Sequence, residues 1–368
     1  MKRTANTLFR RIGFLLALVV TLVAAACSPA ATSPVPSGTA GSSFKGVSLN
    51  GAGATFPFPL YSKWFDEYAK LTGAQINYQS IGSGGGIQQV TQRTVDFGAT
   101  DGPMTDDQLK AAPAKLLHIP MVMGAEAIVY NLAGISSGMK LTPEAVAGIF
   151  LGEISKWNDP KIASANPDLK LPDQAIAVVH RSDGSGTTYI FTDYLSSVSP
   201  TWNSKVGKST SVEWPAGIGG KGNEGVAGQV KQSPGGIGYV ELAYAVQNKL
   251  PYANIKNKGG KFVEPTVDST TAAAAGAIAQ IPDDLRFSMV DPAGDSSYPI
   301  AGATWILVYQ EQSDQVKGRV IVDFLNWALT SGQGMAKDLL YAQLPADLVT
   351  KAQNKVKSIT YQGKPIAP

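Results

Sequence analysis

The sequence of 368 residues has one cysteine, two histidines and a modest share of charged side chains. Because Cys27 is the only cysteine, no intramolecular disulfide can form. Neither His118 nor His180 has a second metal ligand at helical or loop spacing, so we expect both to be structural or solvent-facing, with no metal site and no cofactor. Charged residues make up 16% of the chain and hydrophobic residues 44%, which is typical of a globular protein rather than a disordered one.

Excess positive charge is absent outside the N-terminal segment. Lys2, Arg3, Arg10 and Arg11 carry four positive charges there, and their removal changes the formal net charge from +3 to −1. A chain with this charge and no basic stripe offers no surface for a polyanion. We therefore expect no binding to nucleic acid.

Residues 1–26 have the three parts of an export signal. A basic start is followed by the apolar run 12–23, and the small residues 24–26 stand directly before Cys27. The apolar run is shorter than the roughly 20 residues that a membrane-spanning helix needs. We expect residues 1–26 to be a signal peptide and the protein to be exported.

Cys27 lies at the predicted cleavage junction. A lone cysteine in an exported chain calls for an explanation, and lipid attachment supplies one. The segment resembles a bacterial lipoprotein signal, although Ala24 stands where those signals usually have leucine. Plain cleavage after the alanines is the alternative.

Residues 28–43 are rich in Ala, Ser, Thr, Pro and Gly without charge, so we expect residues 27–46 to form a flexible tether.

The octapeptide 181–188 reads as a tight turn between a strand and a helix. It directly follows the short β-branched apolar run 175–179, and Ile190, Tyr194 and Leu195 follow at helical spacing. The first N–H groups of a helix have no intrahelical partner and lie at the positive end of its dipole. The turn is therefore a candidate anion site.

The side chains of this turn suit an anion. Gly184 and Gly186 allow a ligand to approach the backbone, and Ser185 and Thr187 add hydroxyl donors. The planar fork of Arg181 fits two oxygens of a tetrahedral oxyanion.

Asp183 is placed to hold the fork of Arg181 in position, being two residues further on. A capped turn with a surface Arg–Asp pair is the alternative reading of the octapeptide, because such turns are common in α/β proteins. The two readings are equally compatible with these eight residues, and the rest of the chain decides between them.

Two further glycine-rich turns follow predicted strands. The turn 51–59 follows the strand 47–50, and the turn 81–86 follows the strand 74–80 and leads into a helix from residue 87. A third strand, 96–101, ends in an aspartate. On successive βα units these features gather at the carboxyl edge of a parallel sheet, where ligand crevices of open α/β sheets form.

Four motifs, in chain order, resemble those of the phosphate-binding proteins of bacterial ABC phosphate importers. The likeness spans nearly all of residues 47–368. The motifs are Gly-Ala-Gly-Ala-Thr-Phe-Pro at 51–57, Ile-Gly-Ser-Gly-Gly-Gly at 81–86, Asp-Phe-Gly-Ala-Thr-Asp at 96–101 and Arg-Ser-Asp-Gly-Ser-Gly-Thr at 181–187, and the segments 217–223 and 236–241 extend the match.

The resemblance implies an α/β, two-lobed periplasmic-binding-protein fold of class II, with a hinge of two crossings and a cleft between the lobes. The expected lobe I comprises residues 47–127 and 298–368, and the expected lobe II comprises residues 128–297. The implied protein is not an enzyme. It is an extracytoplasmic monomer, in the periplasm or on the outer face of the membrane, that binds inorganic phosphate and delivers it to the membrane permease of an ABC importer. Apart from the expected lipid anchor at Cys27, we expect no membrane contact.

Carried over by position, the resemblance also implies a ligand set with no catalytic residue. Asp183 orients Arg181, and Asp101 accepts the proton that phosphate keeps near neutral pH. The implied phosphate ligands are Thr55, the Phe56 backbone N–H, Ser83, Asp101, Arg181, Ser185, the Gly186 backbone N–H and Thr187.

Asp101 is expected to decide specificity. An ionised carboxylate only accepts hydrogen bonds, and Asp starts from a pKa near 3.9, so at neutral pH it needs a donor opposite it. Phosphate offers such a proton and sulfate does not. A binder of another oxyanion is one alternative to a phosphate carrier, and a secreted phosphatase or a surface adhesin with this fold are others.

Local signals predict several helix ends. Thr105 to Gln108 reads as a capping box, Thr142 caps a helix with Pro143 at its first position, and Gly73 ends the helix that follows the turn 51–59.

Two further patterns complete the predictions. Residues 220–225 fit G-x-G-x-x-G, but no convincing strand precedes them, so we expect a loop that caps a helix from residue 226 to 231. Val316, Val320, Phe324 and Ala328 predict a helix with one buried face, which ends near Gly332.

Overall fold

The computed structural model describes residues 43–277 and 281–367. The predicted signal peptide, Cys27 and most of the predicted tether lie outside these residues. Within the described part of the chain, no helix combines the length and the apolar character that crossing a bilayer requires.

The strands form one large sheet and two small ones among the described residues. In spatial order the large sheet contains β2 (Gln75–Ser80), β1 (Ser48–Gly53), β3 (Phe97–Thr100), β11 (Ala301–Tyr309), β4 (Leu116–Asn131), β8 (Gly236–Glu241), β6 (Ala177–Arg181) and β7 (Ile218–Gly220). The small sheets are β10 (Phe262–Val263), β9 (Asn254–Lys256) and β5 (Lys140–Leu141), and β12 (Thr360–Tyr361) with β13 (Lys364–Pro365).

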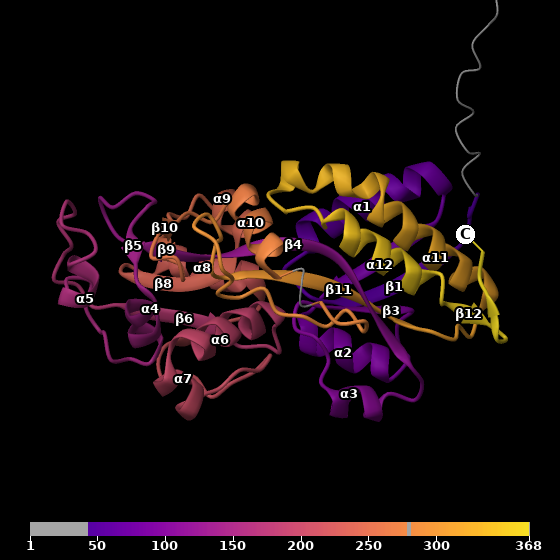
Figure 1. Cartoon of the computed structure of the whole chain (residues 1–368), viewed down its shortest axis with the longest axis horizontal. Coiled ribbons are helices and arrows are strands. Elements are labelled where there is room, and N and C mark those ends of the chain that lie inside the picture. Colours follow the sequence, from indigo (N-terminus) through magenta and orange to yellow (C-terminus); the bar gives the residue numbers. More distant parts are fainter. Residues whose placement is uncertain (1–42, 278–280, 368) are drawn as a thin grey trace, which may run out of the picture. The chain divides into compact units, whose positions relative to one another are not determined.

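Helices connect these strands (Figure 1). They are α1 (Phe58–Thr72), α2 (Ser83–Thr91), α3 (Asp106–Ala111), α4 (Pro143–Phe150), α5 (Pro160–Ala163), α6 (Gly186–Val198), α7 (Pro200–Lys205), α8 (Gly222–Gln232), α9 (Leu242–Gln247), α10 (Val267–Ala277), α11 (Gln315–Leu329) and α12 (Ala346–Val356), with the 3-10 turns η2 (Ser331–Met335) and η3 (Lys337–Leu339).

The long strand β4 joins two groups of parallel strands. Its first part pairs with β11 up to Ala125 opposite Ala301, and its last part pairs with β8 from Glu126 opposite Glu241. The strands β1, β2 and β3 run in the direction of β4, whereas β6, β7 and β8 run against it. The carboxyl ends of the two groups therefore face each other near the middle of β4 (Figure 1).

Local signals place several helix ends where the sequence predicts them. Thr105 and Gln108 form the predicted capping box at α3, and Thr142 caps α4 with Pro143 at its first position. Gly73 ends α1 with a φ of 80°, a conformation that glycine adopts without steric cost. These predictions are confirmed.

The glycine-rich turns differ from the prediction because the regular structure extends into them. Parallel pairing with β2 and β3 carries β1 through Gly53, and α2 begins at Ser83 rather than at residue 87. A Cβ at Gly86 would lie 2.6 Å from the Cα of Gly53 and 2.7 Å from the carbonyl oxygen of Ala99. The glycines thus let the first turn of α2 pack directly on the ends of the strands.

The buried face of α11 is shorter than the sequence predicts. Phe324 packs edge to face on Tyr68 of α1, with ring centroids 5.2 Å apart, and Val320 and Ala328 are buried. Val316 is 54% exposed. Positions four apart drift by about 40° around a helix, so Val316 lies about 120° from Ala328 and leaves the buried stripe.

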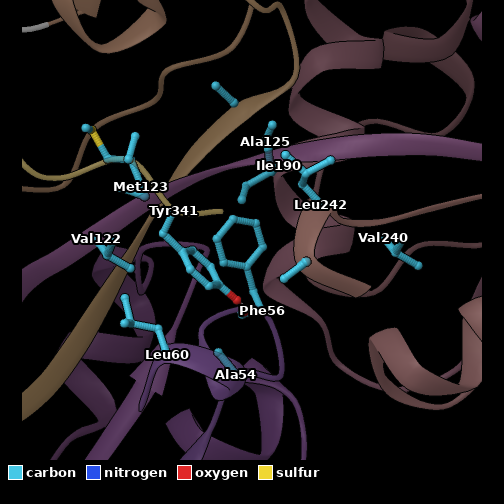
Figure 2. Packing of buried hydrophobic residues seen from close by; sticks show 14 of the residues in the cluster. Ala54, Phe56, Leu60, Val122, Met123, Ala125, Ile190, Val240, Leu242 and Tyr341 are labelled. Carbon is cyan, nitrogen blue, oxygen red and sulfur yellow. Dashed lines mark hydrogen bonds between the residues drawn. The ribbon is translucent and has the colours of Figure 1, made fainter. Parts of the chain in front are cut away.

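A core of hydrophobic side chains fixes the segment after β1. Figure 2 shows the rings of Phe56 and Tyr341 among Leu60 of α1, Val122 of β4 and Leu242 of α9. The two rings meet edge to face, with centroids 6.2 Å apart, and both side chains are fully buried. The backbone next to Phe56, where the sequence predicts ligand contacts, is therefore anchored by the core.

Candidate anion-binding site

Four predicted site residues lie at the carboxyl ends of β1, β2 and β3. Thr55 and Phe56 follow β1, Ser83 opens α2 after β2, and Asp101 directly follows β3. All four are buried. Their convergence is a consequence of the parallel order of these three strands.

The backbone N–H of Phe56 is oriented by a residue that the sequence analysis did not identify. Tyr244 on α9 donates its hydroxyl proton to the carbonyl oxygen of Thr55 at 2.6 Å. In a trans peptide the C=O and the following N–H point in opposite directions, so the Phe56 N–H faces away from Tyr244. This bond fixes the direction of a predicted ligand donor.

Asp101 combines burial with an unpartnered oxygen. The hydroxyl of Ser83 accepts from the Asp101 backbone N–H at 3.2 Å and donates to its Oδ2 at 3.4 Å. Its Oδ1 has no hydrogen-bond partner among the described residues. Burial raises the pKa of Asp101 to about 7, although the Thr304 hydroxyl and the positive charge of Arg181 lower it in part. Without a ligand, the enclosing residues therefore favour the protonated form of Asp101 more than its reference pKa near 3.9 implies.

Arg181 is the last residue of β6, and Asp183 holds its guanidinium. Its Nε donates to Asp183 Oδ1 at 2.8 Å, and its Nη2 donates to Oδ2 at 2.6 Å. Burial alone would lower the pKa of Arg181, but the hydrogen bonds and charge of Asp183 raise it overall. The remaining Nη1 donates to the Thr187 hydroxyl at 3.2 Å. The predicted Arg–Asp contact is present and buried, unlike a surface pair.

The first turn of α6 presents its N–H groups beside this guanidinium. Ser185 is the N-cap, and its hydroxyl accepts from the Thr188 backbone N–H at 3.0 Å. The N–H groups of Gly186 and Thr187 open the helix and have no intrahelical acceptor. A negative charge placed here meets both the helix dipole and Arg181.

The two strand groups bring these residues into contact. The Gly84 backbone N–H on α2 donates to the carbonyl oxygen of Gly184 at 2.8 Å. A Cβ at Gly186 would lie 2.5 Å from Asp101 Oδ2 and 2.5 Å from the Ser83 hydroxyl oxygen. The start of α6 therefore lies directly against the carboxyl ends of β2 and β3.

Substituting Gly186 by alanine tests this contact. The added methyl group meets Asp101 and Ser83 at 2.5 Å, and overpacking of this kind costs about 1–3 kcal/mol. We expect anion affinity to fall roughly five- to 150-fold by titration calorimetry. Gly228→Ala is the matched control, because no atom lies within 4 Å of its added Cβ inside α8. Unchanged affinity in the Gly186 variant would show that the bound form keeps these residues further apart.

The segment 220–225 is a strand end and a helix start, not the predicted loop. The strand β7 pairs with β6, and α8 begins at Gly222, four residues before the predicted start. Gly222 has a φ of 71°, and its N–H donates to Asp183 Oδ1 at 3.1 Å. This turn delivers Asn223 to the site, where its side chain contacts Thr55. The sequence signal for Asn223 was the match of segment 217–223 to the family motifs.

Two further buried carboxyls flank the site at the middle of β4. Glu126 and Glu241 lie opposite each other in the β4–β8 pairing. Glu241 Oε2 accepts from the hydroxyl of Tyr341 at 3.1 Å, whereas neither carboxyl oxygen of Glu126 has a partner among the described residues. Burial raises the pKa of both groups, which favours their neutral forms. The sequence signal for Glu241 was the match of segment 236–241 to the family motifs, whereas no sequence pattern indicated Glu126.

The two histidines have local roles. His118 is buried, and its Nε2 accepts from the Met104 backbone N–H at 3.1 Å. Burial lowers its pKa to about 3, which keeps it neutral. His180 stacks on Trp214 with ring centroids 4.8 Å apart. No group of three or more His, Cys, Asp or Glu side chains among residues 43–277 and 281–367 is arranged to hold a metal ion.

The site gathers donors around one carboxyl. The guanidinium of Arg181 and the start of α6 supply donors on one side, and Thr55 and Ser83 supply hydroxyls on the other. Asp101 supplies a carboxyl whose Oδ1 is free to pair. A tetrahedral oxyanion that carries one proton matches this set.

Comparison with known proteins supports this chemistry. A family model described as a PBP superfamily domain matches residues 30–331. The phosphate-binding protein PstS of Pasteurella multocida is 47% identical over 311 residues, which cover 84% of this chain and 90% of that protein. The PstS of Xylella fastidiosa is 47% identical over 310 residues, covering 84% and 85%.

A solved structure shares the fold. It is a high-affinity periplasmic phosphate-binding protein, PfluDING, bound with phosphate. The TM-score is 0.67 at 22% identity, and the match covers 84% of this chain and 93% of that one. At this identity the similarity concerns the architecture, and it agrees with the two-lobed periplasmic-binding-protein fold.

Proposed function

This chain belongs to the PBP superfamily and, within it, to the PstS phosphate-binding proteins, and we propose that it binds inorganic phosphate outside the cytoplasm and delivers it to the permease of an ABC importer. The observation that carries the proposal is the contact between the start of α6, beside Arg181, and the carboxyl of Asp101. The family consists of binding proteins for transport. We propose that this chain likewise acts as a monomeric carrier and catalyses no reaction.

The proposed ligand set is the one that the family resemblance implies, and the geometry of the site supports it. Each member is buried and presents a donor, or in the case of Asp101 a carboxyl, at the junction of the two strand groups. Asp183 supports the set by holding Arg181. The proposed ligands are Thr55, the Phe56 N–H, Ser83, Asp101, Arg181, Ser185, the Gly186 N–H and Thr187.

Titration calorimetry with a panel of oxyanions tests the function, with a phosphate-ester turnover assay on the same preparation. We expect one phosphate bound per chain, weak or no binding of sulfate, and no ester turnover. Preferred binding of sulfate would favour the binder of another oxyanion. Turnover of the ester would favour the phosphatase, and the absence of any anion binding would favour an adhesin that reuses the fold.

We also propose that residues 47–127 with 298–368 form one lobe and residues 128–297 the other. The change of pairing partner along β4 at Ala125 and Glu126 supports a crossing there. The Gly84–Gly184 hydrogen bond joins the proposed lobes, as expected for a closed clamp.

Phosphate should therefore reduce the radius of gyration in small-angle scattering, because it bridges the lobes and stabilises the closed form. The Arg181→Met variant is the control, and its radius of gyration should be the same with and without phosphate. An unchanged radius in the wild type, with phosphate bound, would contradict hinge closure.

Cys27 is the proposed lipid attachment site, and residues 1–26 the proposed signal peptide. If Cys27 is acylated, native protein should partition with membranes, and Cys27→Ser should release it or stall its processing. Ser28→Ala is the neighbouring control and should leave partitioning unchanged. Soluble native protein that begins after the three alanines would favour plain cleavage.

A further inference from the structure

Asn223 connects the two strand groups inside the site. It lies in the first turn of α8 and is fully buried. Its Nδ2 donates to the hydroxyl oxygen of Thr55 at 2.8 Å and to that of Thr187 at 3.1 Å. Its Oδ1 accepts from the Glu241 backbone N–H at 2.8 Å. One amide therefore bonds to a threonine after β1 and to another on α6.

The orientation of this amide is determined by its surroundings. A backbone N–H can only donate, so the atom that faces the Glu241 N–H must be the carbonyl oxygen of Asn223. The NH₂ group then has to face Thr55 and Thr187. No choice remains between the amide oxygen and nitrogen.

The amide in turn determines what the two hydroxyls can do. A hydroxyl has one proton and two acceptor lone pairs. Thr55 accepts from the Asn223 side chain and, at 3.3 Å, from its backbone N–H. Thr187 accepts from Asn223 and from Arg181 Nη1. Both hydroxyls have their acceptor sites filled, so each can only donate.

We propose that Asn223 is a positioning residue that makes Thr55 and Thr187 obligate donors to the anion and thereby directs the anion's own proton to Asp101. The anion cannot donate its proton to either threonine, because neither hydroxyl has a lone pair left to accept it. Asp101 is the acceptor left for the proton. The inference rests on the proposed function and on the proposed ligand set.

A purely structural role for Asn223 predicts a different order of phosphate affinities among its variants. Asn223→Asp keeps the shape and the contact with the Glu241 N–H, so a structural role makes it milder than Asn223→Ala. The proposal predicts the reverse. A carboxylate only accepts, so the hydroxyls of Thr55 and Thr187 would turn their protons toward it and away from the anion.

The experiment compares phosphate affinity by calorimetry in both variants. Each charge-assisted hydrogen bond is worth roughly ten- to a hundredfold in affinity, so we expect Asn223→Asp to lose on the order of a hundredfold or more and Asn223→Ala considerably less. Asn257→Asp is the matched control. Asn257 is also buried and donates to the backbone carbonyl oxygens of Gly294 and Ser297, away from the site.

The negative charge that Asn223→Asp introduces must be separated from the effect of this substitution on the hydroxyls. Repeating Asn223→Asp in a Thr55→Val, Thr187→Val background removes the hydroxyls but keeps the charge. The proposal predicts a much smaller further loss there than in the wild type. Equal losses in both backgrounds, or a greater loss with Asn223→Ala than with Asn223→Asp, would overturn it.

A second variant covers the case in which Asn223→Asp does not fold. Asn223→Leu has a similar volume and frees one acceptor site on each hydroxyl, so phosphate with an additional proton should be tolerated better. Relative to wild type, its affinity should fall less as the pH is lowered. Parallel pH profiles of the variant and the wild type would overturn the inference. The proposed function would still hold in that case, provided that the wild type binds phosphate. A wild type that binds no phosphate would overturn both.

Discussion

Replacing Arg181 by methionine should remove most of the phosphate affinity. The guanidinium is buried, and it is the charged donor of the proposed ligand set beside the start of α6. Truncating one member of a buried, hydrogen-bonded charge pair costs about 2–5 kcal/mol, which corresponds to a roughly thirtyfold to several-thousandfold loss of affinity. Calorimetry or equilibrium dialysis with phosphate measures this loss.

The expected loss has to be separated from damage to the fold. Arg181→Met removes the two hydrogen bonds that Asp183 accepts from Arg181 in the wild type and leaves its carboxylate without a charged partner. Adding Asp183→Asn removes that unpaired charge and should recover thermal stability but not affinity. Arg286→Met is the matched control, because Arg286 pairs with Asp284, also two residues away, at a partly exposed position. Near-normal affinity in Arg181→Met would refute its role as the ionic contact.

The sequence predicts the local features of the fold well. Gly73 and the capping box at Thr105 act within a few residues, so their effects can be recognised without tertiary information. The boundaries at Gly53 and Ser83 were missed because sheet pairing and close backbone packing extend regular structure into segments whose glycines suggest turns.

The support around the site could not be predicted because it depends on distant residues. Asn223 contacts Thr55 across 168 positions of the chain, and Tyr244 contacts it across 189. Glu126 resembles any other strand residue in the sequence until the pairing with β8 places it opposite Glu241. Motif resemblance predicts the proposed ligands and the role of Asp183 beside Arg181, but not the contacts that Asn223 and Tyr244 make with Thr55.

The protonation state of Asp101 also depends on residues that are distant in the sequence. Its reference pKa is near 3.9, and only the enclosing residues remove the water that would stabilise its charge. Burial raises the pKa to about 7, so before an anion binds both forms of Asp101 are present near neutral pH. The ionised form accepts a proton from phosphate, and the protonated form can donate to an anion that has none.

Sulfate should accordingly be refused in a pH-dependent manner. Above about pH 7 the ionised Asp101 faces an unprotonated sulfate oxygen, and such like-charge contacts cost several kcal/mol. As the pH falls through about 7, Asp101 becomes protonated and the repulsion disappears. Competition of sulfate with phosphate should therefore be weak at alkaline pH and increase as the solution is acidified.

Asp101→Asn should abolish this discrimination. The amide offers an NH₂ donor of nearly the same shape at every pH, so the repulsive contact with sulfate is replaced by a hydrogen bond. We expect the ratio of sulfate to phosphate affinity to rise about a hundredfold or more at alkaline pH, and to lose most of its pH dependence. Calorimetry with both anions at several pH values measures the ratio.

The control for this substitution lies at the other end of the same strand. Asp96 precedes β3, where it pairs with Lys317 at 2.9 Å and accepts from the Asn50 backbone N–H at 2.7 Å. Asp96→Asn should alter stability while leaving the preference between the two anions unchanged. If wild type and Asp101→Asn reject sulfate equally at alkaline pH, the discrimination comes from the shape of the site. The donors at Thr55 and Thr187 could not supply the discrimination by themselves, because they bind unprotonated oxygens of either anion equally well.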